Sequence, residues 1–376
     1  MILKIKNADL QKALGNIQSI VEKRSATAIL MNVKIHTKKN HVSFYTSDLD
    51  IFAQEISEAK VAGELITTTT MQILYDVSRK IAESEIIECI FEPSDKPTKL
   101  LIKSGSSEFT LPCLSADTFP DFEEGEYDCK FEVNADDIYN ILSTVKHAIS
   151  FDDSRYYLNG IFLHATENNG KRVLRAVATD IHRLAMHEID LPKGAENIPD
   201  IIIPKKTVYE FVKLLENYKD NVSISVSKNK IRFKIGSTIL ISKLIDGNFP
   251  DYNRAIPKNN PKVIKISVQE LEKAINLVTT ISTEKVKSIK IKLLKNKITL
   301  FASDKINSSG TIDVPANYDG EELSVAFNSK YLLDILANTS DQNVTMYFDK
   351  SDSAIFINDD SDKKYNFVLM PIAIQF

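Results

Sequence analysis

Ser282 and Lys285 have the spacing of an activated nucleophile, three positions apart in the run 282–285, Ser-Thr-Glu-Lys. A lysine amine at this spacing can take the proton of a serine hydroxyl and so support acyl transfer. The same spacing recurs at 57–60 and 361–364, as expected by chance in a chain rich in serine and lysine. A serine hydrolase therefore stays an alternative hypothesis, with Ser282 as its nucleophile.

Metal and nucleotide sites lack their sequence patterns. No two histidines have the His-Glu-x-x-His spacing of a zinc site, and no Gly-x-x-x-x-Gly-Lys or Gly-x-Gly-x-x-Gly run is present to hold a phosphate. The histidines are His36, His41, His147, His164, His182 and His187. The cysteines are Cys89, Cys113 and Cys129, an odd number without a Cys-x-x-Cys pair, which argues against a disulfide framework. We expect no metal and no cofactor.

The composition is that of an ordinary globular protein. The chain has 376 residues, 43% hydrophobic and 26% charged, with 47 Lys and Arg against 51 Asp and Glu. This excludes a disordered chain, a fibre and a strongly basic nucleic-acid coat. The N-terminal run alternates apolar and charged residues without the apolar core of a secretory signal, and no stretch is apolar for long enough to span a bilayer, so we expect a cytoplasmic protein.

The elements that must position any site occur in a threefold repeat. An apolar stripe at offsets 0, 3, 4, 7 and 11 predicts an amphipathic helix. It appears at Leu10, Ala13, Leu14, Ile17 and Val21, at Ile138, Ile141, Leu142, Val145 and Ile149, and in part at Leu271, Ala274, Ile275 and Val278. Asn7, Asn134 and Ser267 precede the three stripes and are predicted N-caps.

Each copy continues with a strand that ends at an aspartate and then with a second amphipathic helix. The aspartates are Asp48, Asp180 and Asp304, 132 and 124 positions apart. Strands joined by short turns, with two helices per copy, indicate an α+β fold with helices on one face of antiparallel sheets. We predict three domains of one fold, at 1–125, 129–255 and 261–376.

Four runs then carry a family resemblance: 153–160 (Asp-Ser-Arg-Tyr-Tyr-Leu-Asn-Gly), 178–185 (Ala-Thr-Asp-Ile-His-Arg-Leu-Ala), 244–252 (Leu-Ile-Asp-Gly-Asn-Phe-Pro-Asp-Tyr) and 367–372 (Phe-Val-Leu-Met-Pro-Ile). On a full-length threefold repeat, the chain resembles the bacterial sliding clamps, the beta subunits of DNA polymerase III. The resemblance implies a non-enzyme that forms a head-to-tail homodimer, a ring of six domains with helices around duplex DNA. Six similar wedges can close a circle.

The resemblance also implies DNA contacts. Arg24, Tyr156 and Tyr157 match family positions that touch DNA, and Lys205 and Lys206 are basic residues of a candidate lining helix. Guanidinium and ammonium groups suit phosphates, and the rings can stack on exposed bases. The alternative for each is an ordinary surface side chain or a half-buried tyrosine. Composition alone does not indicate DNA binding, and no base-specific contact is expected of a clamp that slides.

A second implied surface is a groove that captures short motifs of the replicative polymerase alpha subunit, clamp-loader subunits and repair proteins. Its apolar walls would be Leu158, Thr179, Leu184, Pro250, Val368, Met370 and Ile372, and its rim Arg155, His182, Arg254, Asn328, Tyr331 and Pro371. For Leu158, Leu184 and Val368 the alternative is plain domain core. Two departures bear on the groove: Ile181 stands where the family usually has glycine, and the tail 373–376 lacks the usual basic residue.

The implied dimer interface joins edge strands of the first and third domains. Phe109, Leu111, Thr280 and Ile281 match the family's positions. Pairing edge strands across subunits would also remove edges that invite aggregation. Besides the hydrolase hypothesis, a repeat scaffold that does not bind DNA remains an alternative.

Overall fold

The structure, a computed structural model, describes residues 2–121, 125–284, 286–304, 308–339, 341–359 and 364–373. The chain divides into two compact units, which are described separately. Unit 1 comprises Met1–Asp136, Pro192–Pro199 and Tyr209–Leu244, and unit 2 comprises Asp137–Leu191, Asp200–Val208 and Ile245–Phe376. The helices α3 (Ala135–Val145) and α4 (Lys205–Leu215) have residues in both.

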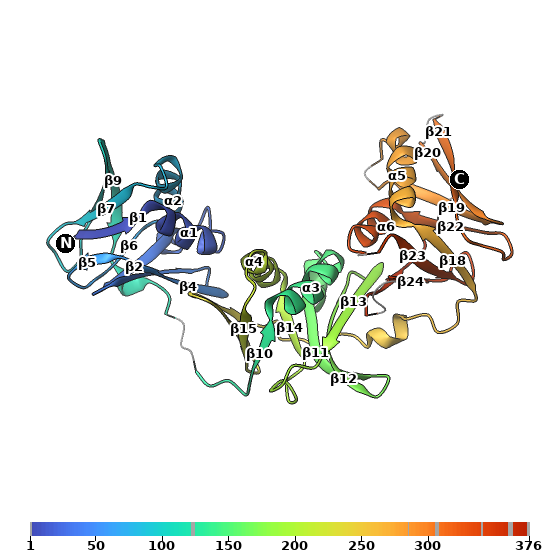
Figure 1. Cartoon of the computed structure of the whole chain (residues 1–376), viewed down its shortest axis with the longest axis horizontal. Helices are drawn as coiled ribbons and strands as arrows, with labels where there is room; N and C mark the ends of the chain where they lie inside the picture. The colour runs from blue at the N-terminus through green and yellow to red at the C-terminus, as the bar shows by residue number, and fades with distance from the viewer. Residues whose placement is uncertain are drawn as a thin grey trace. The chain divides into compact units, whose positions relative to one another are not determined.

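Unit 1 contains one antiparallel sheet of 13 strands (Figure 1). Its order is β10 (Cys129–Asn134), β15 (Asn221–Val226), β16 (Lys230–Ile235), β17 (Thr238–Lys243), β4 (Ile51–Glu58), β3 (His41–Ser47), β2 (Asn32–Lys38), β6 (Leu65–Thr70), β9 (Ser107–Leu114), β8 (Lys99–Ser104), β7 (Ile86–Phe91), β1 (Ile2–Lys6) and β5 (Lys60–Ala62). The helices α1 (Asn7–Ile17) and α2 (Met71–Lys80) pack on it and on each other, with the 3₁₀ turns η1 (Ala28–Met31) and η2 (Ala116–Thr118).

Unit 2 contains two antiparallel sheets. The first has the order β14 (Ile201–Pro204), β11 (Gly160–Asn168), β12 (Lys171–Thr179), β13 (Arg183–Asp190), β25 (Asn366–Leu369), β24 (Ile355–Asp359), β23 (Asn343–Phe348) and β18 (Lys262–Ser267). The second has the order β21 (Ser309–Pro315), β20 (Lys297–Ser303), β19 (Ser288–Leu294) and β22 (Leu323–Asn328). The other elements are α5 (Val268–Val278), α6 (Ser329–Leu336) and the 3₁₀ turns η3 (Lys146–Ala148), η4 (Asp153–Leu158), η5 (Tyr252–Ala255) and η6 (Thr279–Ile281). The predicted α+β class is confirmed.

The three predicted helices form on the apolar stripes, but they are shorter than predicted: α1 ends at Ile17 and α3 at Val145, so the stripe residues Val21 and Ile149 lie beyond the helix ends. In α1 the stripe residues Leu10, Ala13, Leu14 and Ile17 are all buried, as an amphipathic helix on a sheet requires. Two of the predicted N-caps are also confirmed. Asp136 N–H donates to Asn134 Oδ1 (2.9 Å), and Glu270 N–H donates to Ser267 Oγ (3.4 Å).

The prediction that Asn7 caps α1 is wrong. Asn7 is the first residue inside the helix and is buried, and the cap position is Lys6, which makes no side-chain cap bond. The Asn7 amide instead donates to the carbonyl oxygens of Ser78 (2.9 Å) and Ile81 (2.8 Å) at the end of α2. The last carbonyl groups of a helix lack partners within it, so Asn7 caps the neighbouring helix at its C-terminus.

The strand that ends at an aspartate recurs with the same turn. Asp48 Oδ1 accepts from Ile51 N–H (2.7 Å), and Asp180 Oδ1 accepts from Arg183 N–H (3.0 Å). In the third copy Asp304 Oδ1 accepts from Ser308 N–H (2.7 Å), across a loop one residue longer whose residues 305–307 lie outside the described part. Ile51, Arg183 and Ser308 are therefore equivalent, and so are the strands β4, β13 and β21 that follow them.

Two of these strands join their sheets to the next repeat in the same way. β4 pairs with β17, where Ala53 lies opposite Leu240, and β13 pairs with β25, where Ala185 lies opposite Phe367. All four side chains are fully buried. A small residue opposite a large apolar one is thus a repeated feature of these junctions, since opposite side chains share one face of a sheet.

Candidate functional site

The floor of the predicted groove is a row of side chains on three neighbouring strands of unit 2. Thr179 on β12 lies opposite Leu184 on β13, which lies opposite Val368 on β25. Leu184 and Val368 belong to a buried apolar cluster with Val177, Met186 and Tyr252, and Leu158 is also buried. Because these side chains are buried, they belong to the domain core, and a ligand could contact only their outermost atoms.

The segment 245–255 would form one side of the predicted groove. Pro250 and Arg254 are exposed on it, and the Arg254 side chain is held by Asp251, whose Oδ2 accepts from Nε (3.1 Å). Phe249 and Tyr252 of the same segment point the other way and pack against the apolar cluster. Exposed and packed residues therefore alternate along this segment.

The other side of the predicted groove would be built from Met370, His182 and Tyr331, which contact one another. Met370 N–H donates to the His182 carbonyl oxygen (2.9 Å), and the Met370 side chain is 41% exposed. The His182 ring stacks on the Tyr331 ring of α6, with centroids 6.3 Å apart. An exposed thioether beside two rings is an adaptable apolar surface.

Arg183 lies beneath this side and holds it together. Its guanidinium pairs with Asp180 (3.0 Å) and with Asp334 of α6 (2.6 Å), and donates to the carbonyl oxygen of His147. The same group lies over the Tyr331 ring. Burial, followed by the negative charge of Asp180, raises the pKa of Tyr331 above its ordinary value.

Two predicted groove residues, Pro371 and Ile372, are among the last described residues of the chain. Ile372 N–H donates to the Ala326 carbonyl oxygen (2.9 Å), and Pro371 and Ile372 line a cavity of about 510 Å³. The other lining residues are Lys290, Ser324, Val325, Ala326, Ser351, Asp352 and Ala373. Sequence reasoning missed them, because strand lysines and turn serines carry no signal that separates them from a solvated surface. Residues 374–376 lie outside the described part.

Two of the predicted rim residues have structural contacts of their own. The Asn328 side chain caps α6, where its Oδ1 accepts from Lys330 N–H (3.0 Å). Arg155 on η4 is half-buried and forms an ion pair with Asp152 (3.6 Å).

Ile181, which replaces the family's glycine, keeps the glycine-like backbone. Its φ is 72°, in the left-handed region that a β-branched side chain disfavours. The turn is held by Thr179 Oγ1, which accepts from Ile181 N–H (3.1 Å), and by Asp180. Leu49 occupies the same place in the first repeat with φ 78°. The same turn therefore occurs in the first and second repeats, and the Ile181 side chain is exposed on it.

The predicted DNA contacts Tyr156, Tyr157 and Lys205 lie on one surface of unit 2. Lys205 N–H donates to the Asn159 carbonyl oxygen (2.9 Å), which joins η4 to the start of α4. Tyr156 is 54% exposed and packs edge-to-face on Tyr157. The Lys205 ammonium lies 3.7 Å from the ring centre of Phe151, which is 71% exposed. Sequence reasoning missed Phe151, because a single phenylalanine in a loop gives no signal of exposure.

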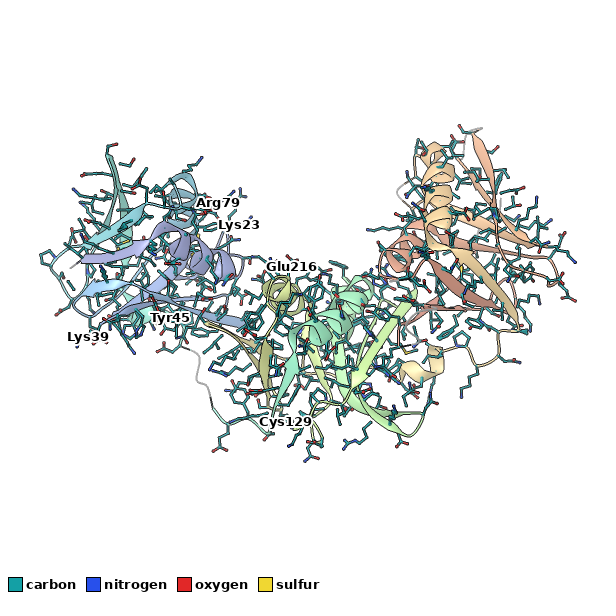
Figure 2. The ribbon with its side chains drawn as sticks, viewed as in Figure 1. Lys23, Lys39, Tyr45, Arg79, Cys129 and Glu216 are labelled. Carbon is teal, nitrogen blue, oxygen red and sulfur yellow. The ribbon has the colours of Figure 1, made fainter. Side chains whose placement is uncertain are left out.

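The two other predicted contacts are basic residues, Lys206 beside Lys205 and Arg24 in unit 1. Lys206 is exposed beside Lys205 at the start of α4. Arg24 is exposed in the loop after α1, next to Lys23. Figure 2 shows Lys23 in that loop and Arg79 on α2, basic side chains beside the helices of unit 1.

The predicted interface residues differ in exposure. Phe109 on β9 is 39% exposed, whereas Leu111 is buried in unit 1. In unit 2, Thr280 is exposed and Ile281 is half-buried, both in η6. Ser282, the nucleophile of the hydrolase hypothesis, is buried, and its partner Lys285 lies outside the described residues.

In the described part of the chain, no helix has the length and apolar character needed to cross a membrane. The cysteines Cys89, Cys113 and Cys129 are buried free thiols, and burial raises the pKa of Cys89 to about 12.

Family models match nearly the whole chain. The N-terminal, central and C-terminal domains of the DNA polymerase III beta subunit match residues 1–123, 132–251 and 253–373. The chain belongs to the DNA polymerase III beta subunit family. Because this family is a non-catalytic processivity factor, the chain is not an enzyme, and the serine hydrolase hypothesis is wrong.

Individual members of the DNA polymerase III beta subunit family are similar to this chain over nearly its whole length. The beta sliding clamp of Caulobacter vibrioides is 35% identical over 376 residues, all of both chains, and that of Pseudomonas putida is 29% identical over 98% of this chain and 99% of its own. A solved Caulobacter crescentus beta sliding clamp has a TM-score of 0.96 at 35% identity, over 100% of this chain and 99% of that one. A Bartonella birtlesii sliding clamp bound to griselimycin has a TM-score of 0.95 at 33% identity, over all of both chains.

Proposed function

We propose that two copies of this chain close head to tail into a ring around duplex DNA, tether the replicative polymerase and recruit other proteins through the groove of unit 2. Each copy supplies three clamp domains, at 1–125, 129–255 and 261–376, and the protein acts in the cytoplasm on the nucleoid. The ranges matched by the three family models support this division. The non-DNA scaffold alternative loses its support, because the relatives are sliding clamps.

The observation that carries the proposal is a pair of strand edges in the described part of the chain: β21 lies at the edge of its sheet, and β9 pairs with β8 over residues 107–112, whereas β6 reaches only Cys113 and Leu114. β4 and β13 are each paired by the last strand of the next repeat, β17 and β25, but β21 stands at the edge of its sheet. In the first repeat, β9 is the strand equivalent to β17. Both follow a two-residue turn that begins with a glycine at φ 55°, Gly105 and Gly236.

The equivalence gives the register of the missing pair. Ser107 corresponds to Thr238, so Phe109 corresponds to Leu240, while Gly310 on β21 corresponds to Ala53 on β4. Leu240 lies opposite Ala53, and Phe109 of one copy would therefore lie opposite Gly310 of the other. The third junction would again put a large apolar residue opposite a small one.

The surroundings of Gly310 support this register. A Cβ added at Gly310 would lie 3.5 Å from side-chain atoms of Ile281 and Val278. Because opposite residues share a face, the Phe109 ring would come to lie on that face, beside Ile281. Head-to-tail contacts of this kind close a ring when the rotation per subunit allows it, and otherwise grow into filaments.

Disulfide crosslinking distinguishes a closed ring from a filament. In a chain with Cys89, Cys113 and Cys129 replaced by Ala, the pair Phe109→Cys and Gly310→Cys should oxidise into a covalent dimer, because directly opposite Cα atoms lie about 4.5–5.5 Å apart, within disulfide range. The control pair Phe109→Cys and Ile312→Cys is two residues out of register and should stay largely uncoupled. A ladder of higher oligomers, or a monomer, would contradict the closed ring.

The charge of the chain fits retention by topology. A protein that holds DNA by charge alone needs a basic face, and its affinity falls steeply with salt. The formal charge here is −4, so the basic and aromatic side chains Arg24, Tyr156, Lys205 and Lys206 would guide DNA rather than grip it. Such contacts to phosphates do not read sequence and permit sliding.

The groove would take an extended peptide with Leu and Phe anchors over its apolar floor. Leu184 and Val368 would support the anchors, with Pro250 on one side and Met370 on the other. The Bartonella birtlesii clamp binds griselimycin, which makes griselimycin a defined probe for this chain.

A further inference from the structure

The 245–255 wall of the groove is attached to its sheet mainly through side chains. At its start Ile245 N–H donates to the Ile202 carbonyl oxygen (3.0 Å). Further along, the described contacts with the sheet come from Phe249 and Tyr252, which pack against the cluster of Leu184 and Val368. The placement of Pro250 and Arg254 therefore depends on how these two rings are held.

Phe249 is held by a stack of rings. It lies on Phe162 of β11, with centroids 4.8 Å apart and planes at 5°, and Phe162 lies on His164, with centroids 4.5 Å apart. Stacked rings of this kind prefer a defined offset, so the stack fixes one end of the wall relative to β11.

Tyr252 is held by its hydroxyl group. Arg175 Nη1 donates to the Tyr252 oxygen (3.0 Å), and His164 Nε2 lies 3.0 Å from the same oxygen. Because arginine can only donate, the tyrosine oxygen accepts from it and can donate its own proton to His164. Burial lowers the pKa of His164, which keeps the imidazole neutral and able to accept.

The Arg175 guanidinium is itself fixed. Its Nε (2.9 Å) and Nη2 (2.6 Å) donate to Oε2 of Glu188, which stands directly opposite on β13. Oε1 of Glu188 accepts from Asn168. Glu188 and His164 are both buried, so this chain of hydrogen bonds lies behind the groove, out of reach of a ligand on its surface.

We propose that His164 and Arg175 are positioning residues of the peptide groove, which act by fixing the Tyr252 hydroxyl and with it the wall that carries Pro250 and Arg254. The inference rests on the proposed function, because it concerns the affinity of that groove. It predicts that partner binding depends on buried residues that no partner touches.

Calorimetric titration with griselimycin tests the proposal. Tyr252→Phe removes one oxygen and keeps the ring in its cluster, and it should raise the Kd for griselimycin measurably, by up to about tenfold, since the free energy of one buried hydrogen bond sets the upper limit. The matched control Tyr218→Phe, outside this network, should leave the Kd unchanged. Thermal melting and sedimentation should show both variants folded and dimeric.

Substitutions at His164 separate positioning from mere packing. His164→Leu should weaken binding as Tyr252→Phe does, whereas His164→Gln keeps an acceptor near the Nε2 position and should restore most of the affinity. Arg175→Met is combined with Glu188→Gln, so that no buried carboxylate is left without its cation. Added to Tyr252→Phe, it should cause little further loss, because the hydroxyl through which it acts is already gone.

The outcomes are distinct. Wild-type affinity in Tyr252→Phe would overturn the positioning role while leaving the groove intact, and so would equal losses in His164→Leu and His164→Gln. If a variant at His164 or Arg175 does not fold, Tyr252→Phe decides alone. Failure of the wild-type protein to bind griselimycin at all would overturn the proposed groove, and the positioning role with it.

Discussion

The guanidinium carbon of Arg183 lies 4.3 Å from the centre of the Tyr331 ring. Arg183 stands on β13 and Tyr331 on α6, so one buried cation connects this strand with this helix, both of which belong to the proposed groove. The same cation is neutralised by Asp180 and Asp334.

Arg183→Met removes the cation and leaves both carboxylates near each other in a partly buried site. We expect the free energy of unfolding to fall by about 3–5 kcal/mol, the range for breaking a buried ion pair on one side. Arg254→Met is the control, because the pair of Arg254 with Asp251 is exposed and should contribute less than about 1 kcal/mol. Urea unfolding followed by circular dichroism measures both, and equal losses would contradict the role given to Arg183.

The stability of the protein should depend on His147 in mildly acidic solution. Burial, with a further contribution from the Arg183 charge, lowers the pKa of His147 from 6.5 to about 4. Between pH 6.5 and pH 4 the unfolded chain therefore binds a proton at His147 that the folded chain does not bind. The free energy of unfolding is highest above pH 6.5 and falls as the pH is lowered towards 4. The lost free energy is at most about 3 kcal/mol.

Unfolding by urea at a series of pH values tests this dependence. His147→Gln should have a flatter profile than the wild type between pH 6.5 and 4, and a matched control, His36→Gln, replaces a histidine of unit 1 instead. Parallel profiles for wild type and His147→Gln would show that His147 does not contribute.

Ile181→Gly should stabilise the protein. A β-branched residue in the left-handed region costs about 1–2 kcal/mol, part of which is offset by the greater flexibility of glycine in the unfolded chain. We expect a net gain of about 0.5–1 kcal/mol, by the same principles. Ile181→Ala is the control, since it removes the exposed side chain but keeps the backbone cost. If the thermal midpoint of Ile181→Gly were at or below that of Ile181→Ala, the result would contradict a backbone strain at Ile181.

Phe151 and Lys205 should contribute to DNA binding in different ways. Lys205→Gln should reduce the slope of log K against log salt by about 1, as expected for one lost phosphate contact. Phe151→Ala should weaken binding of single-stranded or primed DNA by about 1–3 kcal/mol, because it removes a ring on which a base can stack. Lys228→Gln, in the turn between β15 and β16, is the control, and fluorescence anisotropy across a salt series is the measurement. If Lys228→Gln reduced the salt slope as much as Lys205→Gln does, the result would contradict a specific phosphate contact of Lys205.

The repeat and the fold class could be predicted from the sequence, because the helices and strands follow local periodicity. Leu271, Ala274, Ile275 and Val278 all face the core as their spacing indicates. The role of Asn7 could not be predicted, because its hydrogen-bond partners Ser78 and Ile81 are about 70 positions away. Capping rules consider only the helix next to a residue in the sequence.

The candidate site was predictable only in part. The resemblance named Leu184 and Val368, but that their strands are neighbours depends on the pairing of β13 with β25. The hydrogen bonds from Arg175 to Glu188 and Tyr252 have no sequence signature, because a buried polar network is defined by distant residues that satisfy one another. The proposed register of Phe109 opposite Gly310 likewise depends on the equivalence of β9 with β17 and of β21 with β4, which no local sequence pattern indicates.

Retention on DNA tests the ring most directly. The protein is loaded by a clamp loader onto nicked circular DNA, and the bound fraction is measured by gel filtration before and after a single cut linearises the circle. We predict that the protein stays on the circle through the column, even at a salt concentration that removes ordinary contacts, and leaves the linear molecule. Equal retention on circular and linear DNA, or loss from both at the same rate, would contradict a ring that holds by encircling.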